Sequence, residues 1–250
     1  MYYRDAVEWY GRWQERWRDP MLTGLLVLLA LEVFAGIPLA RSHITDAPLL
    51  VVVWFLLIIS AVLVAARHWA AIAAIMLSSL LALVANVERL DEPSALRICL
   101  GSASTVVFMV ALIWVVWSAV FGPGRVTHHR IRGAVVIYLS IALSFAALYE
   151  IVSTLSPGAI SGVTTGGGYL ILGRSFVYYS LTTITTTGYG DMAPIAPMAR
   201  SLSNLESIIG QLFPATLLAR IVTLELQGRP RDVDQRVDSK TSQDAGVSEG

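Results

Sequence analysis

The chain has 250 residues, of which 55% are hydrophobic and only 14% charged, and its 18 basic and 18 acidic residues cancel. An ordinary soluble domain has about a quarter charged residues, so this composition excludes that class and indicates that lipid is the main solvent. Zero net charge gives no reason to expect nucleic acid as a partner. The single cysteine, Cys99, cannot form an intrachain disulfide, so the fold does not depend on an oxidising compartment.

The first twenty residues predict an amphipathic helix at the cytoplasmic face of a membrane. Trp9, Trp13 and Trp17 recur at helical spacing, and charged residues occupy the rest of the helix surface. This pattern is typical of a helix that lies in the interface. We expect no cleavable signal peptide, because the apolar stretch that follows is long enough to stay in the bilayer.

Six apolar stretches predict membrane spans, because a helix needs about 20 apolar residues to cross roughly 30 Å of hydrocarbon. They are residues 21–40, 48–66, 69–87, 99–121, 133–155 and 201–226. The sixth keeps Gln211 and Arg220 among apolar residues, so one face of it is expected to meet protein or water, as in a pore-lining helix. We therefore predict an all-α integral membrane protein with six transmembrane helices.

The placement of Lys and Arg predicts the orientation. With a cytoplasmic N-terminus, 13 basic residues fall inside and 5 outside, and the reverse topology inverts this ratio. Both termini are thus expected to be cytoplasmic. Residues 227–250 are polar without apolar periodicity and predict a disordered cytoplasmic tail.

The segment between the fifth and sixth spans is too long for a simple turn. Residues 156–173 are rich in Gly, Ser and Thr and predict an extracellular turret loop, whereas residues 174–185 predict a helix too short to cross the membrane. Pro194 and Pro197 prevent a continuous helix after the glycine-rich stretch. Irregular backbone at membrane depth is tolerated only around protein or a water-filled cavity, so we expect a re-entrant pore helix and loop.

The glycine-rich stretch has the residue types that a cation filter needs. A dehydrated cation requires oxygen ligands, and an extended strand with inward carbonyls supplies them if alternate residues adopt left-handed backbone angles. Gly188 and Gly190 can do so, Asp191 would concentrate cations at the outer mouth, and Tyr189 would brace the strand against the pore helix. The predicted filter comprises Thr186, Thr187, Gly188, Tyr189 and Gly190, with the cation bound by the carbonyls of the first four.

Residues 176–191 resemble the pore helix and filter of the potassium channel superfamily, with Thr187 where many members have Val. Residues 205–222 are similar to the inner helix of bacterial ion-channel proteins, so the resemblance covers roughly residues 133–226, the expected pore domain. It implies that the bound cation at Thr186, Thr187, Gly188 and Tyr189 is K⁺ and that the protein is a homotetramer that passes K⁺ passively, with no cofactor and no enzymatic activity. Family analogy favours a prokaryotic inner membrane.

Residues 21–121 have the topology of a voltage sensor without its gating charges. The expected fourth span, residues 99–121, contains no charged residue, whereas a steep voltage response needs several charges that cross the field. We predict weak or no voltage gating. The four helices form either a collar around the pore domain or a sensor for another stimulus.

Further residues are candidates for gating and for support of the filter. Gly210 and Pro214 lie in the sixth span and form either a gate hinge or a static bend. Glu206, Tyr178 and Tyr179 are candidate supports of the filter, and Glu206 is alternatively a proton sensor or an acid paired within the bundle.

Three other functions are compatible with parts of the pattern. A non-selective cation channel is disfavoured by the intact Gly188-Tyr189-Gly190. A transporter or membrane enzyme would be expected to have internal repeats or a cluster of polar residues at one site. A non-conducting subunit that assembles with another channel is compatible with the sequence, and reversal potentials of reconstituted protein would distinguish these functions.

Overall fold

The computed structural model describes residues 22–35, 56–62, 69–87, 94–120, 128–163 and 168–228. These residues are mostly helical. The elements are η1 (Leu31–Ala35), α4 (Trp69–Val87), α5 (Ala95–Val120), α6 (His128–Leu155), β1 (Ile160–Ser161), α7 (Gly168–Ile184), β2 (Ala193–Pro194) and α8 (Pro197–Gly228). Residues 22–30 and 56–62 are also helical. The expected interfacial helix at 1–20 and the tail beyond residue 228 lie outside the described residues.

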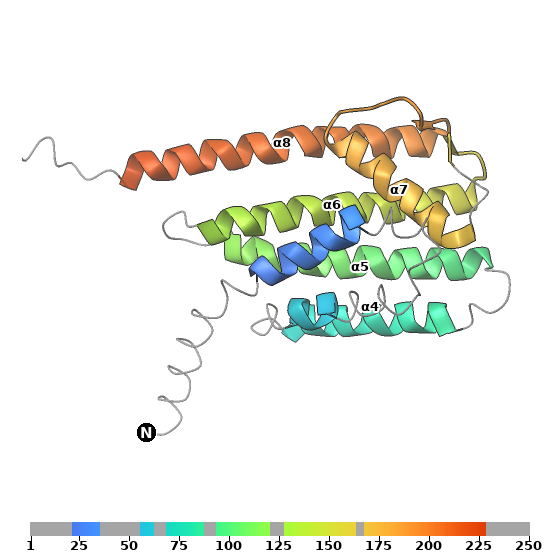
Figure 1. Cartoon of the computed structure of the whole chain (residues 1–250), viewed down its shortest axis with the longest axis horizontal. Coiled ribbons are helices and arrows are strands. Elements are labelled where there is room, and N and C mark those ends of the chain that lie inside the picture. The colour runs from blue at the N-terminus through green and yellow to red at the C-terminus, as the bar shows by residue number, and fades with distance from the viewer. Residues whose placement is uncertain are drawn as a thin grey trace, which may run out of the picture.

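The long helices run side by side. Figure 1 shows α4, α5 and α6 as neighbours with nearly parallel axes, and α8 along the other side of α6. The shorter α7 crosses obliquely at one end of the bundle and contacts both α6 and α8. α6 lies between α5 and α8 and contacts both.

The apolar composition of these helices fits a membrane. Within the described ranges, two helices are long and apolar enough to cross a bilayer, Ala95–Ser118 and Ile131–Leu155, and Leu22–Phe34 and Trp69–Ala82 are shorter apolar helices. Large apolar side chains remain exposed on the outer helices, including Trp69, Leu80 and Trp114. Such side chains are compatible with contact to lipid.

Two clusters of buried side chains hold the helices together. One joins residues 22–33 to α4, α5 and α6 and includes Leu25, Ile75, Leu112 and Ile137. The other surrounds α7 with side chains from α6, the β1 region and the start of α8, including Tyr149, Ile160, Phe176 and Ala199. Since lipid is as apolar as these side chains, close packing and hydrogen bonds stabilise helix contacts more than burial from water does.

Several helices begin earlier than the sequence predicts. α5 begins at Ala95 and α6 at His128, four and five residues before the predicted spans 99–121 and 133–155. α8 begins at Pro197, which fits the first turn because the missing N–H of proline has no helical partner there. A hydropathy pattern locates the apolar part of a helix, and these polar first turns extend beyond it.

The turret region also differs from the prediction. α7 begins at Gly168, so residues 168–173, expected to be loop, form the first turns of the short helix. Before it, β1 pairs antiparallel with β2, with Ile160 opposite Pro194. A Cβ on Gly162, whose φ is +76°, would lie 1.9 Å from the carbonyl oxygen of Asp191. The loop after α6 is therefore tied closely to the chain that follows residue 190.

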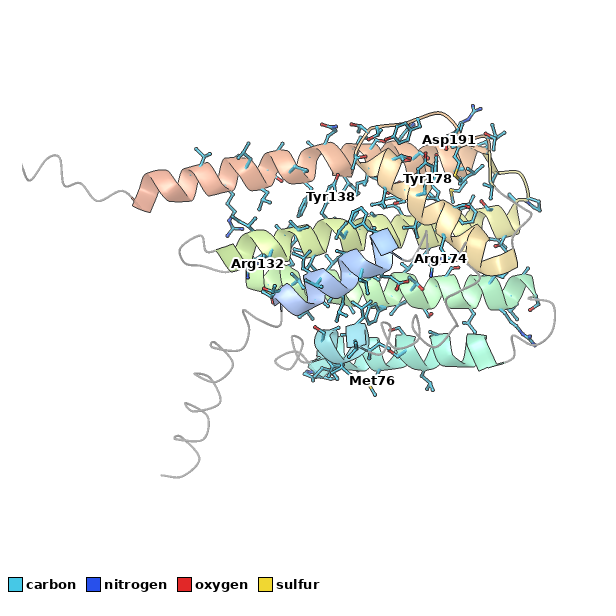
Figure 2. The ribbon with its side chains drawn as sticks, in the orientation of Figure 1. Met76, Arg132, Tyr138, Arg174, Tyr178 and Asp191 are labelled. Atoms are coloured by element: carbon cyan, nitrogen blue, oxygen red, sulfur yellow. The ribbon has the colours of Figure 1, made fainter. Side chains whose placement is uncertain are left out.

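α8 approaches the end of α7 through a glycine. A Cβ on Gly210 would lie 1.9 Å from the carbonyl oxygen of Ile184, the last residue of α7, so only glycine fits there without displacement. The Tyr138 hydroxyl from α6 donates to the same oxygen at 3.1 Å, and Figure 2 shows this tyrosine between α6 and α8. Three helices thus meet at the C-terminal end of α7.

This contact predicts that Gly210→Ala destabilises the protein, whereas Gly24→Ala does not. The new methyl group at 210 has to displace α7 or α8, which costs about 1–3 kcal/mol. At Gly24, also in a helix, a Cβ meets nothing within 4 Å, so alanine is expected to be neutral or stabilising by up to about 1 kcal/mol. Thermal unfolding of the purified protein in detergent measures both. Equal melting temperatures for the two variants would contradict the packing described here.

Candidate functional site

Hydrogen bonds to the last turn of α7 hold the start of the segment 185–191 that follows the helix. The N–H groups of Thr187 and Gly188 both donate to the carbonyl oxygen of Thr182, at 2.9 and 3.1 Å. The N–H of Thr186 donates to the carbonyl oxygen of Thr183 at 2.9 Å. These bonds cap the end of α7 and fix the direction in which the chain leaves the helix. Residues 186–190, which follow, are called the strand below.

Backbone angles alternate along this strand. Thr186, Gly188 and Gly190 have φ of +55°, +54° and +82°, whereas Thr187 and Tyr189 between them do not have positive φ. Residues of alternating hand direct successive peptide groups to the same side, unlike an ordinary β-strand. One side of the strand can therefore present a row of carbonyl oxygens. This is the geometry that the sequence led us to expect of Gly188 and Gly190.

The glycines are needed here for their backbone angles and not for space. A Cβ on Gly188 or Gly190 would meet nothing within 4 Å in the chain, and residues 185–190 are all exposed. Thr186 carries a Cβ in the same left-handed region, which costs on the order of 1–3 kcal/mol. Such strain persists only where neighbouring contacts hold the residue, as the capping bonds do.

Tyr178 of α7 holds the outer end of the strand. Its hydroxyl donates to Asp191 Oδ2 at 2.9 Å, and its ring stacks on that of Tyr189, with centroids 6.3 Å apart and planes 2° from parallel. Figure 2 shows Tyr178 and Asp191 together at this end of the molecule. Asp191 Oδ1 also accepts the N–H of Met192 at 3.1 Å. Tyr178 therefore links α7 to two residues of the expected filter region.

Glu206 of α8 lies behind α7 in a network of hydroxyl groups. Its side chain is fully buried, one carboxylate oxygen accepts from the Tyr149 hydroxyl at 2.6 Å, and the other is bonded to the Ser180 hydroxyl. The Tyr179 hydroxyl lies 2.7 Å from the Ser203 hydroxyl, which also neighbours Tyr149. A buried carboxylate requires such donors, and here they join α6, α7 and α8.

The inner end of the strand meets α8. The side-chain amide of Gln211 donates to the Thr186 hydroxyl oxygen at 2.8 Å, next to a contact of 2.9 Å between the Thr185 and Thr187 hydroxyl groups. Gly210 is in close contact with α7, and Pro214 lies in α8 without ending it. The close packing of α8 on α7 explains why residue 210 is a glycine. The role of Gly210 and Pro214 as a gate hinge stays a prediction.

Polar groups in the other helices lie apart from this strand. Glu150 Oε2 of α6 accepts from the Ser102 hydroxyl of α5 at 2.6 Å. Glu32 in η1 and Arg174 in α7 are close enough for their charges to attract each other. Both contacts join the helices before residue 121 to the part that carries the strand.

The structure thus brings together most of the residues that the sequence singled out. Tyr178 contacts the outer end of the strand. Tyr179 of α7 and Glu206 of α8 belong to the buried hydroxyl network between α6, α7 and α8. Sequence reasoning did not find Tyr149, Ser180 or Ser203, because hydroxyl groups in apolar helices have no distinctive spacing. The signal available was Glu206 itself, since an acid at this depth needs donors from neighbouring helices.

Residues 165–226 match a family model described as Ion channel. No curated protein and no solved structure matches the chain significantly. The matched segment contains α7, the strand and nearly all of α8. The match supports the membership of the potassium channel superfamily that residues 176–191 indicate, and with it an ion-channel function in a membrane.

The carboxylate network predicts a strong coupling between Glu206 and Tyr149. Glu206→Leu removes the nearest acceptor of the buried Tyr149 hydroxyl, at about 1–3 kcal/mol, while the Ser180 hydroxyl keeps the Ala142 carbonyl oxygen at 2.6 Å. Glu206→Gln keeps one acceptor oxygen and is expected to cost less. Tyr149→Phe in the Glu206→Leu background should add little, because the bond is already lost. Thermal unfolding of the four variants measures this. Fully additive losses would show that the two side chains do not act through a shared bond.

Proposed function

We propose that the chain is one subunit of a potassium-selective channel and that residues 186–190 form its filter. The observation that carries the proposal is the alternation of positive φ at Thr186, Gly188 and Gly190 in an exposed strand that follows a short helix. Carbonyl oxygens aligned on one side of a strand can replace the hydration shell of K⁺. The carbonyl groups of Thr186, Thr187, Gly188 and Tyr189 are the proposed ligands.

A single strand offers only one column of oxygen atoms, so the proposed filter needs four copies around an axis. The homotetramer is supported by the exposed apolar face of α8, which carries Leu205, Ile208, Leu212, Leu218 and Val222. An exposed apolar face of this kind suits contact with neighbouring subunits or the wall of a cavity. Asp191 would then form a ring of carboxylates at the outer mouth.

We place this pore in a six-helix subunit. α6 and α8 are the proposed outer and inner helices of the pore domain, and α7 is the re-entrant helix between them. The helices before residue 121 surround the pore domain against lipid, both termini face the cytoplasm, and the membrane is the inner membrane of a prokaryote. K⁺ is the permeant ion and no cofactor is involved.

The filter proposal is tested by a matched pair of glycine variants. Gly188→Ala forces a Cβ into a left-handed residue of the filter, so we expect loss of K⁺ selectivity or at least a tenfold loss of K⁺ flux into liposomes, consistent with a backbone cost of about 1–3 kcal/mol per subunit. Gly158→Ala imposes the same backbone penalty at φ +81° in a loop, also with nothing within 4 Å. We expect this control to retain wild-type flux and selectivity.

Three results would contradict the proposal. Wild-type protein that passes Na⁺ and K⁺ equally would indicate a non-selective channel, and no flux of either ion would indicate a non-conducting subunit. A Gly188→Ala variant with unchanged selectivity and unchanged K⁺ flux would show that the filter lies elsewhere.

The proposed channel is expected to respond weakly to voltage. Arg97 is the one Lys or Arg in α5, and it lies in the first turn of the helix. One charge provides about 2.3 kcal/mol per 100 mV even if it crosses the whole field. The conductance of reconstituted protein in symmetric K⁺ should therefore change only gradually over a range of about −100 to +100 mV. A steep sigmoidal curve would refute this expectation.

A further inference from the structure

Gln211 is a polar residue that the proposed filter does not by itself explain. It lies in an otherwise apolar part of α8, and its side chain is exposed in the chain. Its amide nitrogen lies 2.8 Å from the Thr186 hydroxyl oxygen, and Thr186 is exposed as well. A polar side chain is costly at membrane depth unless it meets protein or water. Both side chains are thus exposed on the same side of the chain as the strand.

The position of Gln211 is fixed by its neighbour. Gly210 brings the backbone of α8 directly against the Ile184 carbonyl, and Ser207, one turn earlier, lies 3.4 Å from the Thr183 carbonyl oxygen. The residue after Gly210 is therefore held beside the first residue of the strand. The next hydroxyl along α8, that of Thr216, bonds instead to carbonyl groups of its own helix at 2.8 and 3.0 Å.

The chemistry of this pair suits a cation. When the amide N–H occupies one lone pair of the Thr186 hydroxyl, the oxygen keeps a second lone pair in a fixed direction. The amide oxygen of Gln211, on the same amide group as the donating nitrogen, is a further acceptor. Neither group is charged, so together they offer neutral oxygen ligands, which is the chemistry suited to a monovalent cation that has lost part of its water.

We propose that Gln211 is a specificity-determining residue of the pore. It positions the Thr186 hydroxyl and contributes its own amide oxygen to the innermost site for a partly hydrated monovalent cation. The inference rests on the proposed function, because only an assembled pore would place these groups around an ion. A hydrogen bond that merely stabilises the left-handed Thr186 would instead affect the amount of folded channel and leave ion preference unchanged.

The test measures ion preference and not total flux. Gln211→Leu removes the amide at similar volume, and we expect the Na⁺/K⁺ permeability ratio to rise about three- to tenfold, the range that corresponds to one hydrogen bond. Gln211→Glu keeps the length and adds charge, so the K⁺ concentration for half-maximal flux should fall by about three- to tenfold. Thr216→Val removes a hydroxyl from the same helix and is the matched control, with both quantities unchanged.

The measurements use full-length protein in liposomes, and each is normalised to the amount of assembled channel. If Gln211→Leu does not assemble, Gln211→Asn, which is shorter by one methylene, tests the same bond. Wild-type ion ratios in the leucine or asparagine variant, with a K⁺-selective wild type, would overturn the role of Gln211 and leave the proposed function intact. A wild type without K⁺ selectivity would overturn both.

Discussion

The close contact between the backbone of α8 and the end of α7 is the constraint on which the site depends. Gly210 allows α8 to reach the Ile184 carbonyl, and Tyr138 bonds to the same oxygen from α6. The strand begins two residues later, at Thr186, and is bonded to the last turn of α7. Any change in the relative position of these three helices therefore moves the first residue of the strand.

Around this contact, each part of the strand has its own support. Gln211 bonds to Thr186 at its inner end, and Tyr178 bonds to Asp191 at its outer end. The pairing of β1 with β2 holds the chain just beyond Asp191. Glu206 stabilises α7 from behind through hydroxyl groups of α6 and α7. Alternating backbone angles are strained at a threonine, so a strand of this kind needs support along its whole length.

The elements that the sequence predicted well are those with a local signal. The expected stretch at residues 69–87 coincides with α4, and the alternating glycines indicated the backbone angles of the strand. α5 and α6 begin a few residues before the predicted spans, at Ala95 and His128, because polar first turns lack the apolar signal. The loop predicted at residues 168–173 was wrong, because this glycine-containing segment forms the first turns of α7. The β1–β2 pair is too short for any periodicity. The partners of Glu206 could not be predicted, since they come together only when three helices pack.

The central claim is that four copies of this strand surround dehydrated K⁺ on a common axis. The most direct measurement is a structure of the purified protein in lipid, with Rb⁺ in place of K⁺ so that anomalous scattering locates the ion. The account predicts a fourfold axis with Rb⁺ peaks between the carbonyl oxygens of residues 186–189. A protein without that symmetry, or strands that face away from the axis with no ion between them, would contradict it.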